Sequence, residues 1–100
     1  MIKHIVMWKL KDEALGATAA ENAKRLKERL EALKGVVDGV IELEVGINTN
    51  PSEAAFDVVL YSVFESMDAL EAYRMHPEHQ KLIGFVGEIR SERRVVDYEA

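Results

Sequence analysis

The residues of this sequence best suited to chemistry run from Tyr73 to His79 and read Tyr-Arg-Met-His-Pro-Glu-His. They bring a phenol, two imidazoles and a carboxylate together around one proline. A neutral imidazole can remove a proton near neutral pH, and a phenol can donate a hydrogen bond to a carbonyl oxygen on which negative charge develops. With His79 as the base and Tyr73 as the donor, the segment fits proton abstraction beside a carbonyl group.

Pro77 divides this segment between two helices. Proline lacks a backbone N–H group and disfavours a helical conformation in the residue before it. We therefore expect one helix to end near Met75 or His76 and another to begin at Pro77. Side chains from two short helices that meet at such a corner can reach one small volume. His76, the residue before the proline, is expected to cap the second helix.

Metal binding is a second chemistry that these side chains could support, because His76, Glu78 and His79 are close in the sequence. Their spacing differs from that of the helical His-Glu-x-x-His motif, and Pro77 interrupts the continuous helix that such spacing requires. We therefore predict that the chain uses neither a metal nor an organic cofactor.

The elements that must position these residues are predicted from hydrophobic periodicity, caps and turn residues. In chain order they are a strand over residues 2–11, a helix over 19–34, strands over 40–47 and 56–64, a helix that begins after Ser66 and breaks at Pro77, and a strand over 93–98. His4 shares one face of the first strand with Ile2, Val6 and Trp8. This face is expected to look toward the helices, so that His4 could meet Tyr73 and His79.

The element order is that of the ferredoxin-like βαββαβ fold, an α+β arrangement with an antiparallel four-stranded sheet. Its helices can cover only one face of the sheet. Apolar residues are nevertheless expected on the other face, and they are Ile5, Met7, Val59, Tyr61, Val63 and Val95. An apolar face of that size is typical of an interface. We therefore predict a homodimer in which two sheets pack face to face.

Composition limits the remaining classes of function. The 100 residues form a single domain, and 18 acidic against 13 basic residues give a net charge of -5, which disfavours binding to nucleic acids and to anionic membranes. The absence of cysteine excludes disulfides and thiolate chemistry. The apolar run near the first residue is too short for a signal peptide or a membrane span, so a cytoplasmic protein is expected.

Four segments resemble the stress-responsive dimeric α/β-barrel family, often shortened to Dabb, and the similarity covers nearly the whole chain. They are Ile2-Lys3-His4-Ile5-Val6 with Lys9-Leu10-Lys11 after it, Phe64-Glu65-Ser66, the corner Tyr73-x-x-His76-Pro77-x-His79 and Val96-Asp97-Tyr98. The resemblance implies a single Dabb domain over residues 1–100. It also implies that two ferredoxin-like subunits join their sheets into a barrel with the helices outside.

Most members of that family lack a defined activity, and the family label records induction under stress. A plant polyketide cyclase in the family, olivetolic acid cyclase, promotes an intramolecular aldol closure without metal or organic cofactor. It uses a tyrosine and a histidine of the corner, and a histidine of the first strand lines the same pocket. The resemblance carries these roles to Tyr73, His79 and His4, whose residue types are all kept here.

The expected function is therefore the binding of a small, largely apolar carbonyl compound between helices and sheet, with Tyr73, His79 and His4 around it. If the protein is an enzyme, the resemblance implies a cofactor-free lyase similar to the polyketide cyclase. Two alternatives stay open. One is a non-catalytic stress or assembly protein, in which the corner only shapes the helix break. The other is an enzyme similar to the cofactor-free monooxygenases that share this architecture.

Overall fold

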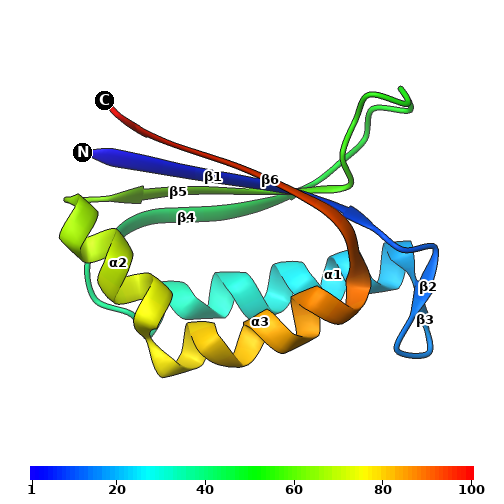
Figure 1. The fold of residues 1–100 in the computed structure, drawn as a ribbon, viewed down its shortest axis with the longest axis horizontal. Coiled ribbons are helices and arrows are strands. Elements are labelled where there is room, and N and C mark those ends of the chain that lie inside the picture. Colours follow the sequence, from blue (N-terminus) through cyan, green and yellow to red (C-terminus); the bar gives the residue numbers. More distant parts are fainter.

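A four-stranded antiparallel sheet forms one layer of the protein and three α-helices form the other (Figure 1). The computed structural model describes residues 1–100. In chain order the elements are β1 (Ile2–Leu10), β2 (Glu13–Ala14), β3 (Ala17–Thr18), α1 (Ala19–Glu31), the 3₁₀ helix η1 (Ala32–Gly35), β4 (Val40–Ile47), β5 (Val58–Phe64), α2 (Met67–Met75), α3 (Pro77–Ile89) and β6 (Arg90–Glu99). None of the helices is long and apolar enough to cross a membrane.

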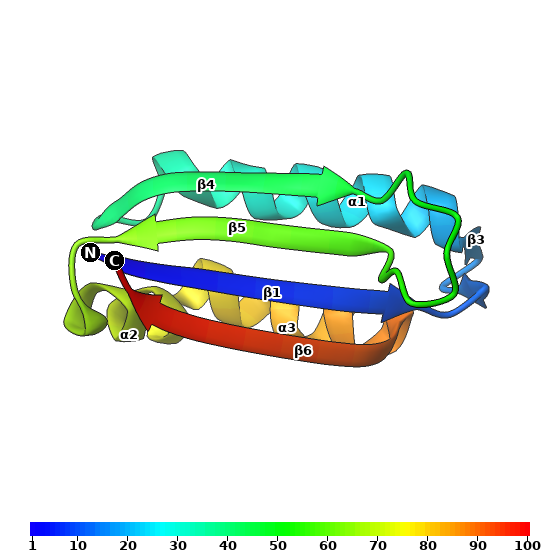
Figure 2. The same ribbon diagram turned by 90° about the horizontal axis from the view of Figure 1, so that it is seen from above.

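The strands are ordered β4-β5-β1-β6, and every neighbouring pair is antiparallel. Figure 2 looks onto the face of the sheet that carries no helix, with α1, α2 and α3 behind it. The first and last strands are antiparallel neighbours, so the two ends of the chain lie together at one end of the strands (Figure 2). This topology confirms the expected ferredoxin-like fold.

Local signals account for most of the helix boundaries. Thr18 and Glu21 form the capping box at the start of α1, each side chain accepting from the other's backbone N–H group. The α-helix ends at Glu31, and η1 continues it to Gly35 with tighter hydrogen bonds. The predicted helix over 19–34 therefore consists of two helices of different types. Ser66 caps α2 by accepting from the N–H group of Ala69.

The core lies between the sheet and the helices. Residues of β1 alternate, and those that face the helices, Ile2, His4, Val6, Trp8 and Leu10, are all buried. Apolar side chains from every helix pack against this face. His4 is the one ionisable residue of this row, so a titratable group lies inside an otherwise apolar layer.

The register of β6 corrects one expected position. Val95 lies opposite Val6, and residues directly opposite in an antiparallel pair share a face, so Val95 faces the helices. The prediction that it belongs to the helix-free face was wrong. Val96 and Tyr98, which lie opposite Ile5 and Lys3, take that place. Alternation along one strand cannot reveal which set of residues faces which layer, because only the pairing with β1 decides it.

Two other features differ from the expected pattern. A short hairpin, β2 and β3, precedes α1, where the sequence pattern predicts no element. In addition, β6 begins at Arg90, directly after α3, and not at Arg93. Residues 90–92 are polar and carry no strand signal, but Arg90 and Glu92 pair with β1. Pairing with β1 therefore makes the polar residues 90–92 part of the sheet, although their side chains give no strand pattern.

Candidate active site

The corner between α2 and α3 is formed by His76 and Pro77. His76 has an extended backbone, and its Nδ1 accepts from the N–H group of Glu78 at 3.1 Å. This bond satisfies one of the free N–H groups at the start of α3, and Pro77 occupies the first helical position. The predicted capping role of His76 is confirmed.

His79 lies in the first turn of α3, and its ring packs on Tyr73 with 4.6 Å between the ring centroids. Its Nδ1 is 3.1 Å from the carbonyl oxygen of Arg74. A carbonyl oxygen can only accept, so Nδ1 carries the hydrogen and Nε2 keeps a free lone pair. Burial lowers the pKa of His79 below its ordinary value, and the bond to Arg74 raises it less. His79 is therefore a neutral base at pH 7.

His4 holds a second imidazole on the floor of the site, with 6.5 Å between its ring centroid and that of Tyr73. Its Nδ1 is 2.5 Å from Oδ1 of Asp97, whose Oδ2 accepts from Arg74 at 2.8 Å. Burial is the largest cause of a lowered pKa at His4, and the charges of Arg74 and Arg93 act in the same direction, while the bond to Asp97 and the charge of Asp97 oppose the shift. His4 is therefore also neutral at pH 7, with its orientation held by Asp97.

Tyr73 is fully buried at the end of α2, between Phe64 and His79. Its hydroxyl group has no hydrogen-bond partner, which is uncommon for a buried polar group. Burial raises the pKa of Tyr73 to about 12, so the hydroxyl keeps its proton at physiological pH. The side chain is a hydrogen-bond donor that the folded chain leaves without an acceptor.

A cavity of about 530 Å³ opens beside these residues, between the sheet and the last two helices. His4 and His79 line it, together with buried apolar side chains that include Val6, Leu60 and Leu82. Tyr73 does not line the cavity but lies directly behind His79. The three predicted site residues are thus neighbours, and two of them reach the cavity surface.

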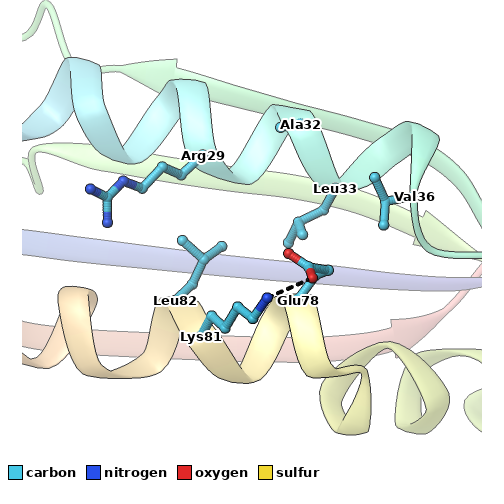
Figure 3. Close-up of a pocket in the computed structure, with 7 residues that line it drawn as sticks. All are labelled: Arg29, Ala32, Leu33, Val36, Glu78, Lys81 and Leu82. Carbon is cyan, nitrogen blue, oxygen red and sulfur yellow. Dashed lines mark hydrogen bonds and ion pairs between the residues drawn. The ribbon is translucent and has the colours of Figure 1, made fainter.

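A second hollow, of about 300 Å³, lies between α1 and α3 (Figure 3). None of His4, Tyr73 and His79 lines it. Its charged groups include Glu78 and Lys81, which form an ion pair at 2.9 Å, drawn as a dashed line in Figure 3. Its third charged residue, Arg29, lies over the ring of Phe85 at 4.0 Å from the centroid, so no histidine, tyrosine or other unpaired acid–base group lines this hollow.

Asp97 and Arg74 are site residues that sequence reasoning missed. Arg74 lies within the corner segment and Asp97 within the closing strand, but no local pattern connects either of them with His4. Asp97 lies directly opposite His4 in the sheet, although 93 positions separate them in the chain. Knowledge of the β1–β6 register is the signal that would have found it. No group of three or more His, Asp or Glu side chains is placed to hold a metal ion.

The two imidazoles are expected to make stability depend on pH. In the folded protein the pKa values of His4 and His79 are lowered, so below about pH 6.5 the unfolded chain binds protons that the folded chain does not. The free energy of unfolding should therefore fall as the pH is lowered from about 7 toward 5. Urea unfolding across this range measures the dependence.

The variant His79→Gln provides the comparison for this pH dependence. It removes one of the two shifted groups and should make the loss of stability toward acid pH smaller. Met67→Gln, at an exposed methionine of α2 outside the cavity, adds and removes no titratable group; it is the matched control and should keep the wild-type dependence. A His79→Gln protein with the full wild-type dependence would contradict the assignment of a lowered pKa to His79.

The fold and the cavity together define a ferredoxin-like α+β domain with a cavity between its two layers. The chain belongs to the Dabb family, the stress responsive A/B barrel domains, whose family model matches residues 2–100. An uncharacterized protein of Streptomyces coelicolor is 30% identical over 82 residues, which cover 80% of each chain.

Two solved structures are similar to this chain in fold. A dimeric protein of unknown function with a ferredoxin-like fold, from Bacteroides fragilis, superimposes with a TM-score of 0.88 and 35% identity, covering 99% of this chain and 95% of that one. A hydroxynitrile lyase from Passiflora edulis has a TM-score of 0.81 and 16% identity, covering 97% of this chain and 90% of that one. The second likeness concerns the fold alone.

Proposed function

We propose that this protein binds a small, largely apolar carbonyl compound in the 530 Å³ cavity and removes a proton from the carbon beside the carbonyl group. One observation carries the proposal. The neutral imidazoles of His4 and His79 line a mostly apolar floor, and the Nδ1 atom of each is already engaged. The Nε2 atoms are therefore the positions at which a ligand proton can be accepted. The step uses no metal and no organic cofactor.

In the proposed step, Nε2 of His79 takes the proton and the carbon–hydrogen bond breaks. The electron pair of that bond forms an enolate, whose charge rests on the former carbonyl oxygen. The Tyr73 hydroxyl, which retains its proton, donates a hydrogen bond to this oxygen. Because the hydroxyl is buried behind His79, side chains around it must move when the ligand enters.

A second carbonyl group in the same ligand would allow ring closure. The enolate carbon attacks that carbonyl carbon, one carbon–carbon bond forms, and the resulting alkoxide takes the proton back from His79. No net proton or electron is then gained or lost. The resemblance of Tyr73, His79 and His4 to the plant polyketide cyclase residues supports this aldol closure. The fold shared with a hydroxynitrile lyase is compatible with lyase chemistry in such a domain.

Exchange of hydrogen for deuterium in a simple ketone tests the proton step without knowledge of the natural substrate. In deuterated buffer, the protein is expected to replace the hydrogens beside the carbonyl group of cyclohexanone with deuterium faster than buffer alone, as measured by proton NMR. Trp8 is the single tryptophan and lines the cavity, so its fluorescence reports whether the ketone has entered. Entry without exchange above the buffer rate would contradict the proposed catalysis.

The pH profile of exchange should follow the lowered pKa of His79. Burial keeps its imidazole neutral below the ordinary histidine range, so the rate constant should stay high down to about pH 6.5 and decline only below it. The rate constant at saturating ketone, measured from about pH 5 to pH 8, gives the profile. A decline that is already complete at neutral pH would mean that His79 is not the base.

We also propose that two copies pair through the helix-free face of the sheet. This face carries the apolar residues Ile5, Met7, Val59, Tyr61, Val63, Val96 and Tyr98. Val96 is 53% exposed in the single chain, which is unfavourable for a large apolar side chain on a broad apolar surface. The dimeric state of the 35% identical relative supports a second copy as the partner.

Analytical ultracentrifugation at micromolar concentration is expected to show twice the 11.3 kDa mass of one chain. Val96→Glu places a charge on the helix-free face and should shift the protein toward monomer. Met67→Glu, at an exposed methionine of α2, is the matched control and should remain dimeric. A monomeric wild-type protein at this concentration would contradict the proposed pairing.

A further inference from the structure

We infer that the ligand of this cavity carries an anionic group, a carboxylate or a phosphate, which Arg90 and Arg93 bind at the cavity rim. The inference rests on the proposed function, because it concerns the same cavity. It narrows the ligand class from an apolar carbonyl compound to one with an acidic end. The evidence is the placement of the two arginines, their charge balance and the shape of the wall beside them.

Arg90 and Arg93 lie at the start of β6, where this edge strand leaves α3. Both line the cavity. Arg93 lies directly opposite Trp8 of β1, so it shares the face of the sheet that looks toward the helices. The side chains of both arginines are exposed, whereas His4 and Trp8 are buried. The arginines therefore form the rim of the cavity, and the imidazole of His4 belongs to its floor.

The charges at this rim are not balanced. Arg74, the third arginine of the cavity lining, is paired with Asp97 at 2.8 Å and with Glu71 at 3.4 Å. None of the ion pairs in the structure includes Arg90 or Arg93. Two unpaired cations thus lie together at one cavity mouth in a chain with a net charge of -5. An anionic ligand would supply the missing counter-charge.

The environment of Arg93 agrees with a site for an anion. Partial burial and the positive charges of Arg90 and Arg74 lower its pKa, while the charge of Asp97 opposes them. Beneath it, the buried side chain of Trp8 lines the cavity. The guanidinium groups of Arg90 and Arg93 therefore supply hydrogen-bond donors and positive charge to this part of the wall, and both suit a group rich in acceptors.

The rest of the cavity fits an apolar body. Val6, Leu30, Leu60 and Leu82 line it and are buried, and the volume lies within the range of small-molecule sites, about 300–1,000 Å³. A guanidinium group matches both carboxylate and phosphate through paired hydrogen bonds. An amphiphilic ligand can therefore place its chain on the floor and its acidic end between the two arginines.

Three probes with the same alkyl chain test this inference: octanoate, octyl phosphate and octanol. Their binding is measured by the fluorescence of Trp8 and by calorimetry. At least one of the two anions is expected to bind about tenfold or more tightly than the alcohol, because charged hydrogen bonds to arginine add affinity. In Arg90→Gln/Arg93→Gln this advantage should disappear, while octanol affinity stays unchanged. Arg25→Gln, on the exposed face of α1, is the matched control and should bind like wild type.

Each outcome has a separate meaning. Tighter binding of octanoate identifies a carboxylate site, and tighter binding of octyl phosphate identifies a phosphate site. Equal affinity for the anions and octanol overturns the inference, and so does an anion preference that survives in the double variant. Both arginines are exposed, so the variant should unfold at the wild-type temperature, and Arg93→Gln alone provides a milder test.

The inference and the proposed function can fail independently. An arginine-dependent anion preference without hydrogen exchange into cyclohexanone would refute the catalysis and leave an anion-binding cavity. Exchange without any anion preference would refute only the anionic ligand. If neither cyclohexanone nor any of the three octyl probes changes the fluorescence of Trp8 or gives a heat of binding, the cavity does not bind ligands of this size, and both are refuted.

Discussion

Replacing His79 with glutamine is expected to lower the rate constant for hydrogen exchange into cyclohexanone by about a hundredfold or more, because a positioned general base contributes roughly 10²–10⁴-fold. Glutamine has no basic lone pair that can take a proton at neutral pH. Its amide N–H group can still donate to the carbonyl oxygen of Arg74, as Nδ1 of His79 does at 3.1 Å. The variant therefore removes the base while the bond across the corner can be kept.

The same variant tests the alternative that His79 only ties α2 to α3. If the imidazole only ties α2 to α3, the wild-type protein should show no exchange above the rate in buffer. His79→Ala, which loses the bond to Arg74, should then unfold at a lower urea concentration than His79→Gln, which can keep it. If His79 is the base, His79→Gln loses exchange with a nearly unchanged unfolding midpoint. His76→Gln should keep the wild-type rate, since His76 lies outside the cavity. Full activity in His79→Gln would refute the assignment.

Replacing Tyr73 with phenylalanine is expected to leave the fold at least as stable as wild type, with a gain of about 1 kcal/mol in the free energy of unfolding. The Tyr73 hydroxyl is buried and has no hydrogen-bond partner. On folding it therefore loses its bonds to water without replacement, which lowers the free energy of unfolding of the wild-type protein. Phenylalanine keeps the ring that packs on Phe64 and His79, at 5.1 and 4.6 Å between centroids. Urea unfolding measures the difference.

The same substitution should lower the exchange rate constant by about a hundredfold, because an oxyanion then loses its donor. A gain in stability combined with a loss of activity is typical of a group retained for function. Tyr61→Phe removes a hydroxyl on the helix-free face and should change the exchange rate little. Two results would contradict the role of Tyr73. One is an unchanged exchange rate, and the other is a clear loss of stability, which would mean that the hydroxyl is bonded in the native protein.

These two variants address different parts of one step. His79 would take the proton, and Tyr73 would stabilise the charge that the proton leaves behind. If both act in the same transition state, the double variant should lose less than the product of the two single losses, because their effects are coupled. If the loss of rate in the double variant equals the product of the two single losses, the two side chains act in separate steps.

Features that depend on neighbouring residues could be predicted from the sequence. The spacing of Thr18 and Glu21 predicts the start of α1, and Pro77 predicts the break between α2 and α3. His76 was predicted to cap α3 from its position before the proline, and its bond to Glu78 confirms this. Caps and helix breaks involve groups only a few positions apart, so the chain itself holds them close together.

The sequence by itself determined the order of the α-helices and of the four strands of the main sheet, the corner and the three candidate residues of the site. The tertiary structure decided which groups accompany them. Asp97 reaches His4 across the sheet, and Val96 takes the place expected for Val95, because the register between β1 and β6 is set by backbone pairing between distant segments. The cavity and the position of Tyr73 behind its wall depend on how the helices pack on that sheet. No local pattern encodes either, since both arise from contacts between residues far apart in the chain.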